Sequence, residues 1–95
     1  MDAVPSGEAR NTRPCVVVSP DELNRHVETA IIAPISTTRA KYPTRVEIEF
    51  LNGARHVILD QIRTVDKDRL VKKVGEVDAG ARKKILETLT ELFAE

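Results

Sequence analysis

Hydrophobic positions divide the chain into a front with the periodicity of strands and an end with the periodicity of a helix. Short apolar runs rich in β-branched residues, at 15–18 and 29–35, predict strands that are covered on both faces. Residues 44–50 alternate between apolar and charged side chains, which predicts a strand with one buried face. Residues 20–25, PDELNR, can form one helical turn between the first two strands.

Turn signals connect the remaining strands. Asn52 and Gly53 predict a two-residue hairpin turn, because both residues tolerate the positive φ that a type I′ turn requires. The partner strand of this hairpin is then expected at 56–62. DKDR at 66–69 predicts another turn, and LVKKVGEV at 70–77 predicts a further short strand.

The last part of the chain has the spacing of an amphipathic helix, predicted over 78–94 with Asp78 as its N-cap. Residues 1–12 are polar and turn-forming, and predict a loop or arm. About five short strands with one terminal helix indicate an α+β fold, a small and strongly twisted barrel made by one domain over 1–95. The predicted apolar stripe of the helix consists of Ile85, Leu86, Leu89, Leu92 and Phe93.

Length and charge limit the classes of partner. A chain of 95 residues buries only roughly 60–65% of its unfolded surface, so an oligomeric interface is expected to help stability. Lysine plus arginine and aspartate plus glutamate number 15 each, so any binding of nucleic acid must use a local patch. The longest apolar run, near 30–35, is too short to span a bilayer, and we expect no membrane association.

Several kinds of chemistry have little support in the sequence. Cys15 is the only cysteine, which excludes an intrachain disulfide and, without an apolar leader, indicates a reducing cytoplasm. Within an apolar run it is interpreted as a small buried hydrophobe, since a nucleophile would need an adjacent base. His26 and His56 have no second histidine at ligand spacing and are interpreted as structural or solvated. No phosphate-binding or metal-binding motif is present, so no metal and no cofactor are predicted.

Three polar segments are candidates for a site. Pro14 cannot donate to a β ladder and belongs at a strand start or edge, which leaves Arg13 at the mouth of that strand. A cation there can be a placed functional group or a solvated side chain at the sheet rim. Three hydroxyl residues at 36–38 end a buried strand, and Asp60 and Gln61 lie at the far end of the predicted hairpin. Each of these segments is either a set of polar caps or part of a binding site.

A resemblance to a known family joins these segments. The stretches GEARNTRPCVVVSPDELN, IIAPIST, YPTRVEIEF and LDQIRTVDKDRLVKKVG follow one another in the order of motifs typical of the MazF/PemK toxin endoribonucleases. The similarity extends from about Ala3 to Leu92. It implies a compact SH3-like barrel with helices, shared with the gyrase-poisoning CcdB toxins, in agreement with the architecture predicted above.

The resemblance also implies an activity. Members of the family are toxins of type II toxin–antitoxin systems that cleave single-stranded RNA in a sequence-specific manner without a metal. The RNA's own 2′-hydroxyl attacks the adjacent phosphate, which leaves a cyclic phosphate and a 5′-hydroxyl. The expected partners are single-stranded RNA, a cognate MazE-like antitoxin and a second copy of the chain in a homodimer.

Site residues are carried over position by position. Arg13 matches the family's RP arginine, whose guanidinium can stabilise the negative charge of the transition state. Ser36 or Thr37 matches the catalytic threonine. Asp60 matches a carboxylate that acts as an acid or base in members with an arginine two residues earlier, where this chain has Ile58. The predicted catalytic residues are Arg13, Ser36 and Thr37, and the predicted RNA-binding residues are Glu8, Thr12, Thr38, Tyr42, Asp60 and Gln61.

The chain departs from the family at its beginning. Family members usually start with a strand similar to RGDIWLVDLDP, whereas this chain starts with MDAVPSGEAR. We therefore expect the family's first strand, just before Asp2, to be absent. That absence would expose an unpaired sheet edge and remove one anchor of the loop that carries Glu8, which puts the activity in question.

Two non-enzymatic alternatives stay open on the sequence alone. One is a toxin-like binding protein on the same barrel, either a gyrase inhibitor or a truncated relic that binds an antitoxin. The other is an SH3-like module for proline-rich peptides, which would need a groove lined by aromatic side chains. The chain has only three aromatic residues, Tyr42, Phe50 and Phe93, which disfavours the peptide-binding module.

Overall fold

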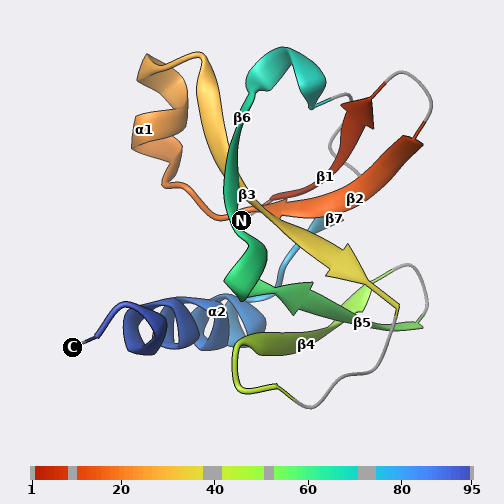
Figure 1. Ribbon diagram of the computed structural model, residues 1–95, viewed down its shortest axis with the longest axis vertical. Helices are drawn as coiled ribbons and strands as arrows, with labels where there is room; N and C mark the ends of the chain where they lie inside the picture. The colour runs from red at the N-terminus through yellow and green to blue at the C-terminus, as the bar shows by residue number, and fades with distance from the viewer. Residues whose placement is uncertain (1, 9–10, 38–41, 51–52, 71–74, 95) are drawn as a thin grey trace.

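The computed structural model of the chain describes residues 2–8, 11–37, 42–50, 53–70 and 75–94. The strands hydrogen-bond in the order β4–β5–β3–β2–β1–β7, and β6 also pairs with β3 (Figure 1). This sheet and the C-terminal helix form the predicted α+β, barrel-like fold. The elements are β1 (Asp2–Glu8), β2 (Asn11–Val17), α1 (Asp21–His26), β3 (Thr29–Ser36), β4 (Arg45–Phe50), β5 (Gly53–Ile58), β6 (Arg63–Asp66), β7 (Gly75–Glu76) and α2 (Ala79–Leu92), with 3-10 turns at Leu59–Gln61 and Lys67–Arg69.

Strand β3 belongs to both halves of the sheet. One of its edges pairs antiparallel with β2, where Cys15 lies opposite Pro34. Its other edge pairs first with β6, from Thr29 onward, and then with β5, where Ser36 lies opposite His56. Because side chains alternate along a strand, β3 contributes to two different faces.

The first face forms the larger core, against α2. Ile85 of α2 is fully buried there, and α2 runs beside β4 and β5 at the bottom of the molecule (Figure 1). The Asp78 side chain accepts a hydrogen bond of 2.8 Å from the backbone N–H of Ala81, which confirms the predicted N-cap. The buried residues of this core are Val16, Ala33, Ile35, Val46, Ile48, Val57, Leu59 and Ile85.

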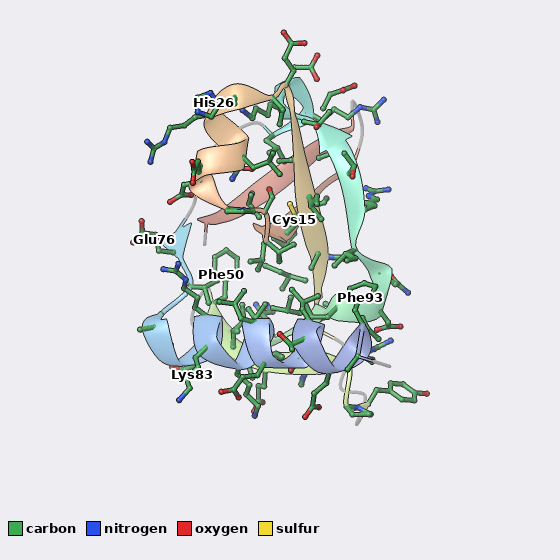
Figure 2. The ribbon with its side chains drawn as sticks, turned by 90° about the vertical axis from the view of Figure 1, so that its left-hand side faces the viewer. Cys15, His26, Phe50, Glu76, Lys83 and Phe93 are labelled. Atoms are coloured by element: carbon green, nitrogen blue, oxygen red, sulfur yellow. The ribbon has the colours of Figure 1, made fainter. Side chains whose placement is uncertain are left out.

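The predicted apolar stripe of α2 is only partly buried. Ile85 and the half-buried Leu89 pack on the first core, but Leu86 is 44% exposed and Phe93 is 68% exposed. Leu92 is also exposed. The prediction that all five residues share one buried stripe is therefore wrong, because the helix touches the sheet along a narrower line than its sequence pattern suggests. Figure 2 shows Phe50 on the side of α2 that faces the sheet and Lys83 on the opposite side.

The second face carries a smaller core on the opposite side of β2 and β3. Its buried residues are Cys15, Val17, Ala30, Ile32 and Val65. Cys15 is 2% exposed, which confirms its interpretation as a small buried hydrophobe. Burial raises the pKa of the Cys15 thiol to about 11, partly opposed by the positive charge of Arg63.

A buried serine connects α1 to the sheet. The hydroxyl of Ser19 donates to the side-chain oxygen of Asn24 on α1 and accepts a hydrogen bond of 3.1 Å from the backbone N–H of Ile31. The Asn24 amide donates in turn to the Ser19 carbonyl at 3.1 Å. The predicted helical turn at 20–25 is thus confirmed, and a polar network fixes it to β3. No helix in the described ranges is long and apolar enough to cross a membrane.

The N-terminal prediction is wrong. Residues predicted as a loop or arm over 1–12 form β1 and the start of β2, paired from Ala3 opposite Val16 to Glu8 opposite Asn11. The polar composition of these residues gives no strand signal, because the strand is stabilised by hydrogen bonds to β2 and, at Asp2 and Ala3, to β7. Strand β2 is consequently paired on both edges. The expectation that a family strand is missing before Asp2 stays a prediction.

The hairpin is present, with a different register. The alternation of 44–50 is confirmed, since Val46 and Ile48 are buried whereas Glu47 and Glu49 are exposed. Gly53, however, is the first residue of β5 and lies opposite Phe50, so it is not a central turn residue. Asn52 lies outside the described residues.

The strand predicted at 56–62 is also interrupted. Strand β5 ends at Ile58, and the chain forms a 3-10 turn at Leu59–Gln61 before it enters β6. The change of direction lets β6 pair with β3 in place of β4. Of the strand predicted at 70–77, the described part is the two-residue β7, and the turn predicted at 66–69 includes the second 3-10 turn.

Truncation of Ile85 tests the first core. We expect Ile85→Ala to lower the free energy of unfolding by about 2–5 kcal/mol, because it leaves a cavity between α2 and the sheet. The matched control Leu86→Ala, on the neighbouring exposed position, should change it by less than about 1 kcal/mol. Urea denaturation of both variants measures the difference, and equal effects would contradict this packing.

The buried thiol predicts a pH dependence of stability. An unfolded thiol titrates near 9.0 and Cys15 in the fold near about 11, so the unfolded state loses its proton first as the pH rises. The contribution of the buried Cys15 thiol to the free energy of unfolding is complete below pH 9 and declines up to about pH 11. Between these limits we expect the wild type to lose of the order of 1–2 kcal/mol more unfolding free energy than Cys15→Val. Parallel pH profiles of the two proteins would refute this.

Candidate active site

Two predicted catalytic positions, Arg13 and Ser36, lie beyond the same end of the β2–β3 ladder. Cys15 lies opposite Pro34 in the antiparallel ladder. Arg13 is two residues before Cys15 and Ser36 is two residues after Pro34, so both continue from the same end of this ladder and on the same face. That face is the one that carries the second core.

The β1–β2 hairpin positions Glu8 and Thr12. Ser6 lies opposite Arg13, and Glu8 lies opposite Asn11, two positions nearer the hairpin tip. Since side chains alternate, Glu8 and Arg13 occupy register positions on one face of the hairpin, and Thr12 occupies the other.

The three hydroxyl residues differ in their settings. Ser36 is the last residue of β3 and is half-buried, whereas Thr37 is the first residue beyond the strand and is exposed. Thr38 lies outside the described residues. Of the two candidates for the catalytic hydroxyl, Ser36 has the position that the β2–β3 and β3–β5 ladders fix.

Tyr42 is an exposed aromatic ring held by the start of β4. Its ring is 60% exposed, and the Arg45 guanidinium lies 5.0 Å from the ring centroid, a cation–π contact. The Arg45 backbone N–H donates to the Tyr42 carbonyl at 3.1 Å. The exposed face of the ring remains available for stacking with a base.

Asp60 and Gln61 are exposed residues of the 3-10 turn that follows β5. The Thr44 hydroxyl donates to the Asp60 carboxylate at 3.0 Å, and the Leu59 backbone N–H donates to the Thr44 carbonyl at 3.0 Å. These bonds connect the turn to the segment that carries Tyr42. The structure thus joins Asp60 to the entry of β4, beyond the end of the strand that pairs with Ser36.

His56, which the sequence analysis interprets as structural or solvated, lies opposite Ser36, and Glu47 follows on the next strand. In the ladders, Ser36 is opposite His56 on β5, and His56 is opposite Glu47 on β4. The turn predicted at Asn52–Gly53 would have paired His56 with Glu49, so the local hairpin signal gave the wrong neighbour. The pairing of β5 with β3 depends on contacts distant in sequence, which no local pattern reports.

The described residues were also compared with the requirements of a metal-binding site and of a reactive thiolate. The side chains that the structure describes contain no group of three or more His, Cys, Asp or Glu residues placed to hold a metal ion. The burial and raised pKa of Cys15 leave it a neutral thiol near pH 7, which is a poor nucleophile. His26 lies at the other end of β3, in a polar hollow beside Glu28 and Asp66.

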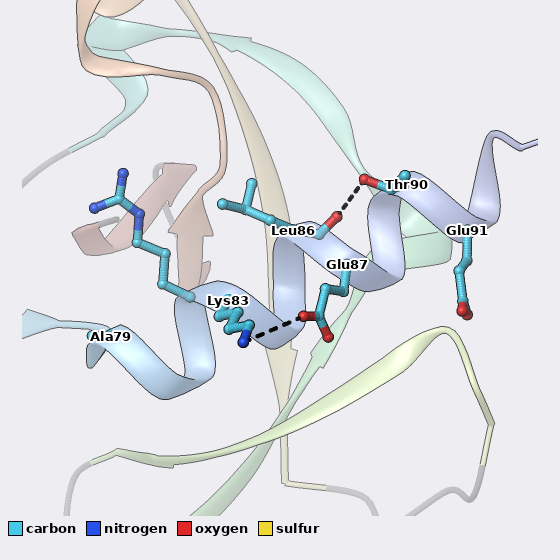
Figure 3. Close-up of a pocket in the computed structure, with 7 residues that line it drawn as sticks. Ala79, Lys83, Leu86, Glu87, Thr90 and Glu91 are labelled. Atoms are coloured by element: carbon cyan, nitrogen blue, oxygen red, sulfur yellow. Dashed lines mark hydrogen bonds and ion pairs between the residues drawn. The ribbon is translucent and has the colours of Figure 1, made fainter.

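An apolar groove of about 640 Å³ runs along α2 (Figure 3). Its walls come from one helix and include an exposed ion pair of 4.0 Å between Lys83 and Glu87. Because α2 and the first core separate this groove from Ser36, it is not part of the predicted site. It is lined by Ala79, Arg82, Lys83, Leu86, Glu87, Thr90 and Glu91.

Comparison with known sequences identifies relatives over nearly the whole chain. The family model of the PemK-like, MazF-like toxin of type II toxin–antitoxin systems matches residues 1–93. Endoribonuclease EndoA of Bacillus subtilis is 36% identical over 95 residues, which cover 94% of this chain and 82% of that protein. Endoribonuclease MazF of Staphylococcus saprophyticus is 38% identical over 80 residues, 78% of this chain and 67% of that protein.

Solved structures show the same fold. An endoribonuclease in complex with its cognate antitoxin, from a mycobacterial species, superposes with a TM-score of 0.85 at 27% identity, covering 95% of this chain and 88% of that one. The toxin MazF-mt6 of Mycobacterium tuberculosis superposes with a TM-score of 0.86 at 21% identity, covering 98% and 96% of the two chains. With the family model and the EndoA similarity, these likenesses show that the chain belongs to the PemK-like, MazF-like toxins of type II toxin–antitoxin systems.

Proposed function

We propose that this chain is the toxin of a type II toxin–antitoxin pair and that it cleaves single-stranded RNA where the ends of β2 and β3 meet. The observation that carries the proposal is the β2–β3 register, whose last pair is Cys15 opposite Pro34, with Arg13 and Ser36 each two residues beyond it at the same end. Two relatives that are identical at more than a third of the aligned positions are named endoribonucleases. They favour the nuclease over a gyrase inhibitor, a relic or a peptide-binding module.

The reaction requires little covalent chemistry from the protein. The 2′-hydroxyl of the RNA attacks the adjacent phosphorus, the bond to the 5′ oxygen breaks, and a cyclic phosphate and a 5′-hydroxyl result. The negative charge on the phosphate oxygens grows toward the transition state, and Arg13 stabilises it with a planar fork of N–H donors. No metal or cofactor takes part in the proposed reaction.

The other predicted residues surround this position. Ser36, or Thr37 beside it, holds a phosphate oxygen or orients the 2′-hydroxyl through its hydroxyl group. Tyr42 stacks on a base, supported by its contact with Arg45. The remaining proposed RNA contacts are Glu8, Thr12, Thr38, Asp60 and Gln61.

The proposed partners follow from the family. A mycobacterial relative was solved with its cognate antitoxin, and we propose a MazE-like antitoxin for this chain as well. We further propose that the toxin acts in the cytoplasm, where RNA is present and the buried Cys15 stays reduced.

Cleavage of RNA in excess EDTA tests the proposed reaction. The wild type should produce discrete fragments with 5′-hydroxyl ends, and Arg13→Ala should cleave at least about 100-fold more slowly, because the transition-state charge loses its donor. Arg25→Ala, on α1 at the other end of β3, is the control and should retain full activity. Equal cleavage by Arg13→Ala, or cleavage that needs an added metal, would refute the proposal.

We also expect a homodimer. Light scattering at micromolar concentration should give twice the mass of a 10.6 kDa chain, since a domain this small gains stability from an interface. A mass equal to one chain would contradict the expectation.

A further inference from the structure

We propose that His56 is a catalytic residue of the RNA cleavage, the acceptor of the 2′-hydroxyl proton, and that Glu47 positions it. The inference rests on the proposed function and extends it to two residues to which the family resemblance assigns no role. It starts from the strand order β4–β5–β3, which places three polar residues in one row across the sheet.

The row follows from the ladders. Ser36 is opposite His56 and His56 is opposite Glu47, and residues directly opposite in antiparallel strands have Cβ atoms about 5 Å apart on the same face. The order across β3, β5 and β4 is therefore hydroxyl, imidazole and carboxylate. On the other edge of β3 the ladder with β2 ends at Cys15 opposite Pro34, and Arg13 and Ser36 each lie two residues beyond that pair.

The burial pattern supports the same placement. The neighbouring row of Ile35, Val57 and Val46 is buried in the first core, against α2. The next row, one residue along, belongs to the opposite face, and there Ser36 and His56 are half-buried while Glu47 is exposed. The imidazole is therefore accessible to a ligand on this face.

The chemistry needs a group of this type. Abstraction of the 2′-hydroxyl proton near neutral pH is most efficient with a base that titrates in that range, as imidazole ordinarily does. A guanidinium ordinarily stays protonated, so Arg13 stabilises charge well but accepts protons poorly. The row places an imidazole next to the hydroxyl that holds the substrate, with a carboxylate on its other side to orient the ring.

The proton balance of the proposed step is closed. The 2′ oxygen forms its bond to phosphorus as its proton passes to the neutral imidazole of His56. The bond from phosphorus to the 5′ oxygen breaks, and this oxygen takes a proton from solvent. The imidazolium then releases its proton to solvent, which restores the neutral base.

Among the described residues, the charged groups beside His56 on its face of the sheet are of both signs. On β4, Glu47 lies opposite, and Arg45 and Glu49 lie diagonally along the same face. On β3 the opposite residue is Ser36, and the neighbours of His56 on its own face of β5 are uncharged.

Imidazole rescue tests the assignment, with the chain's other histidine as a matched control. We expect His56→Ala to reduce the single-turnover rate at least about 100-fold and added imidazole to restore part of it, whereas His26→Ala cleaves like the wild type. His56→Gln keeps a polar side chain in the strand and should lose the rate with an unchanged melting temperature. Full activity of either His56 variant, or a loss that imidazole does not restore, would overturn the assignment.

A binding measurement separates this proposal from the proposed function. The two histidines give two sets of imidazole C–H signals in NMR, and a single-stranded RNA with 2′-deoxy groups should shift those of His56 only. Shifts confined to His26 would overturn the placement of His56. If the wild type and His56→Ala cleave RNA at the same rate, the proposed nuclease activity stands and the proposed role of His56 is refuted. If the wild type binds RNA but does not cleave it, the nuclease activity itself is refuted.

Discussion

The division of β3 between two faces is the constraint on which the rest of the structure depends. Ala33 and Ile35 point toward α2 and the first core, whereas Ala30 and Ile32 belong to the second core on the other side. A strand buried on both faces must be apolar almost throughout, and its hydrogen bonds must be satisfied on both edges. Strands β2, β5 and β6 supply those bonds.

The same constraint decides where polar chemistry can exist. Along β3 the apolar requirement ends at Ser36, where the second core has ended but the ladder with β5 continues. A hydroxyl there is held by a rigid strand and is still partly exposed, a combination that a binding site needs. Arg13 lies beyond the same end of the β2–β3 ladder, because the strands are antiparallel and their last pair is Cys15 opposite Pro34.

Elements that neighbouring residues determine could be predicted from the sequence, whereas elements that depend on pairing between distant strands could not. The alternation of β4 and the Asp78 cap follow from neighbouring residues, and both were predicted correctly. Strand β1 was missed because its residues are polar and its pairing with β2 supplies its stability. The hairpin register was wrong because Asn52–Gly53 outweighed the longer-range pairing that places Gly53 opposite Phe50.

The candidate site shows the same division between local and distant causes. Motif order was enough to select Arg13 and the hydroxyls near Ser36, since the resemblance fixes them by sequence position. The neighbours of Ser36 could not be selected in this way, because His56 is 20 positions along the chain and is adjacent only through strand pairing. Partial burial of Leu86 and Phe93 likewise depends on how α2 lies on the sheet.

The most direct test of the central claim is a crystal structure with a single-stranded RNA whose 2′-hydroxyl at the cleavage point is replaced by hydrogen. We expect the scissile phosphate to lie between Arg13 and Ser36, on the face of the sheet away from α2, with the 2′ carbon toward His56. A phosphate held elsewhere, for example along the α2 groove with Arg13 and Ser36 unoccupied, would contradict it.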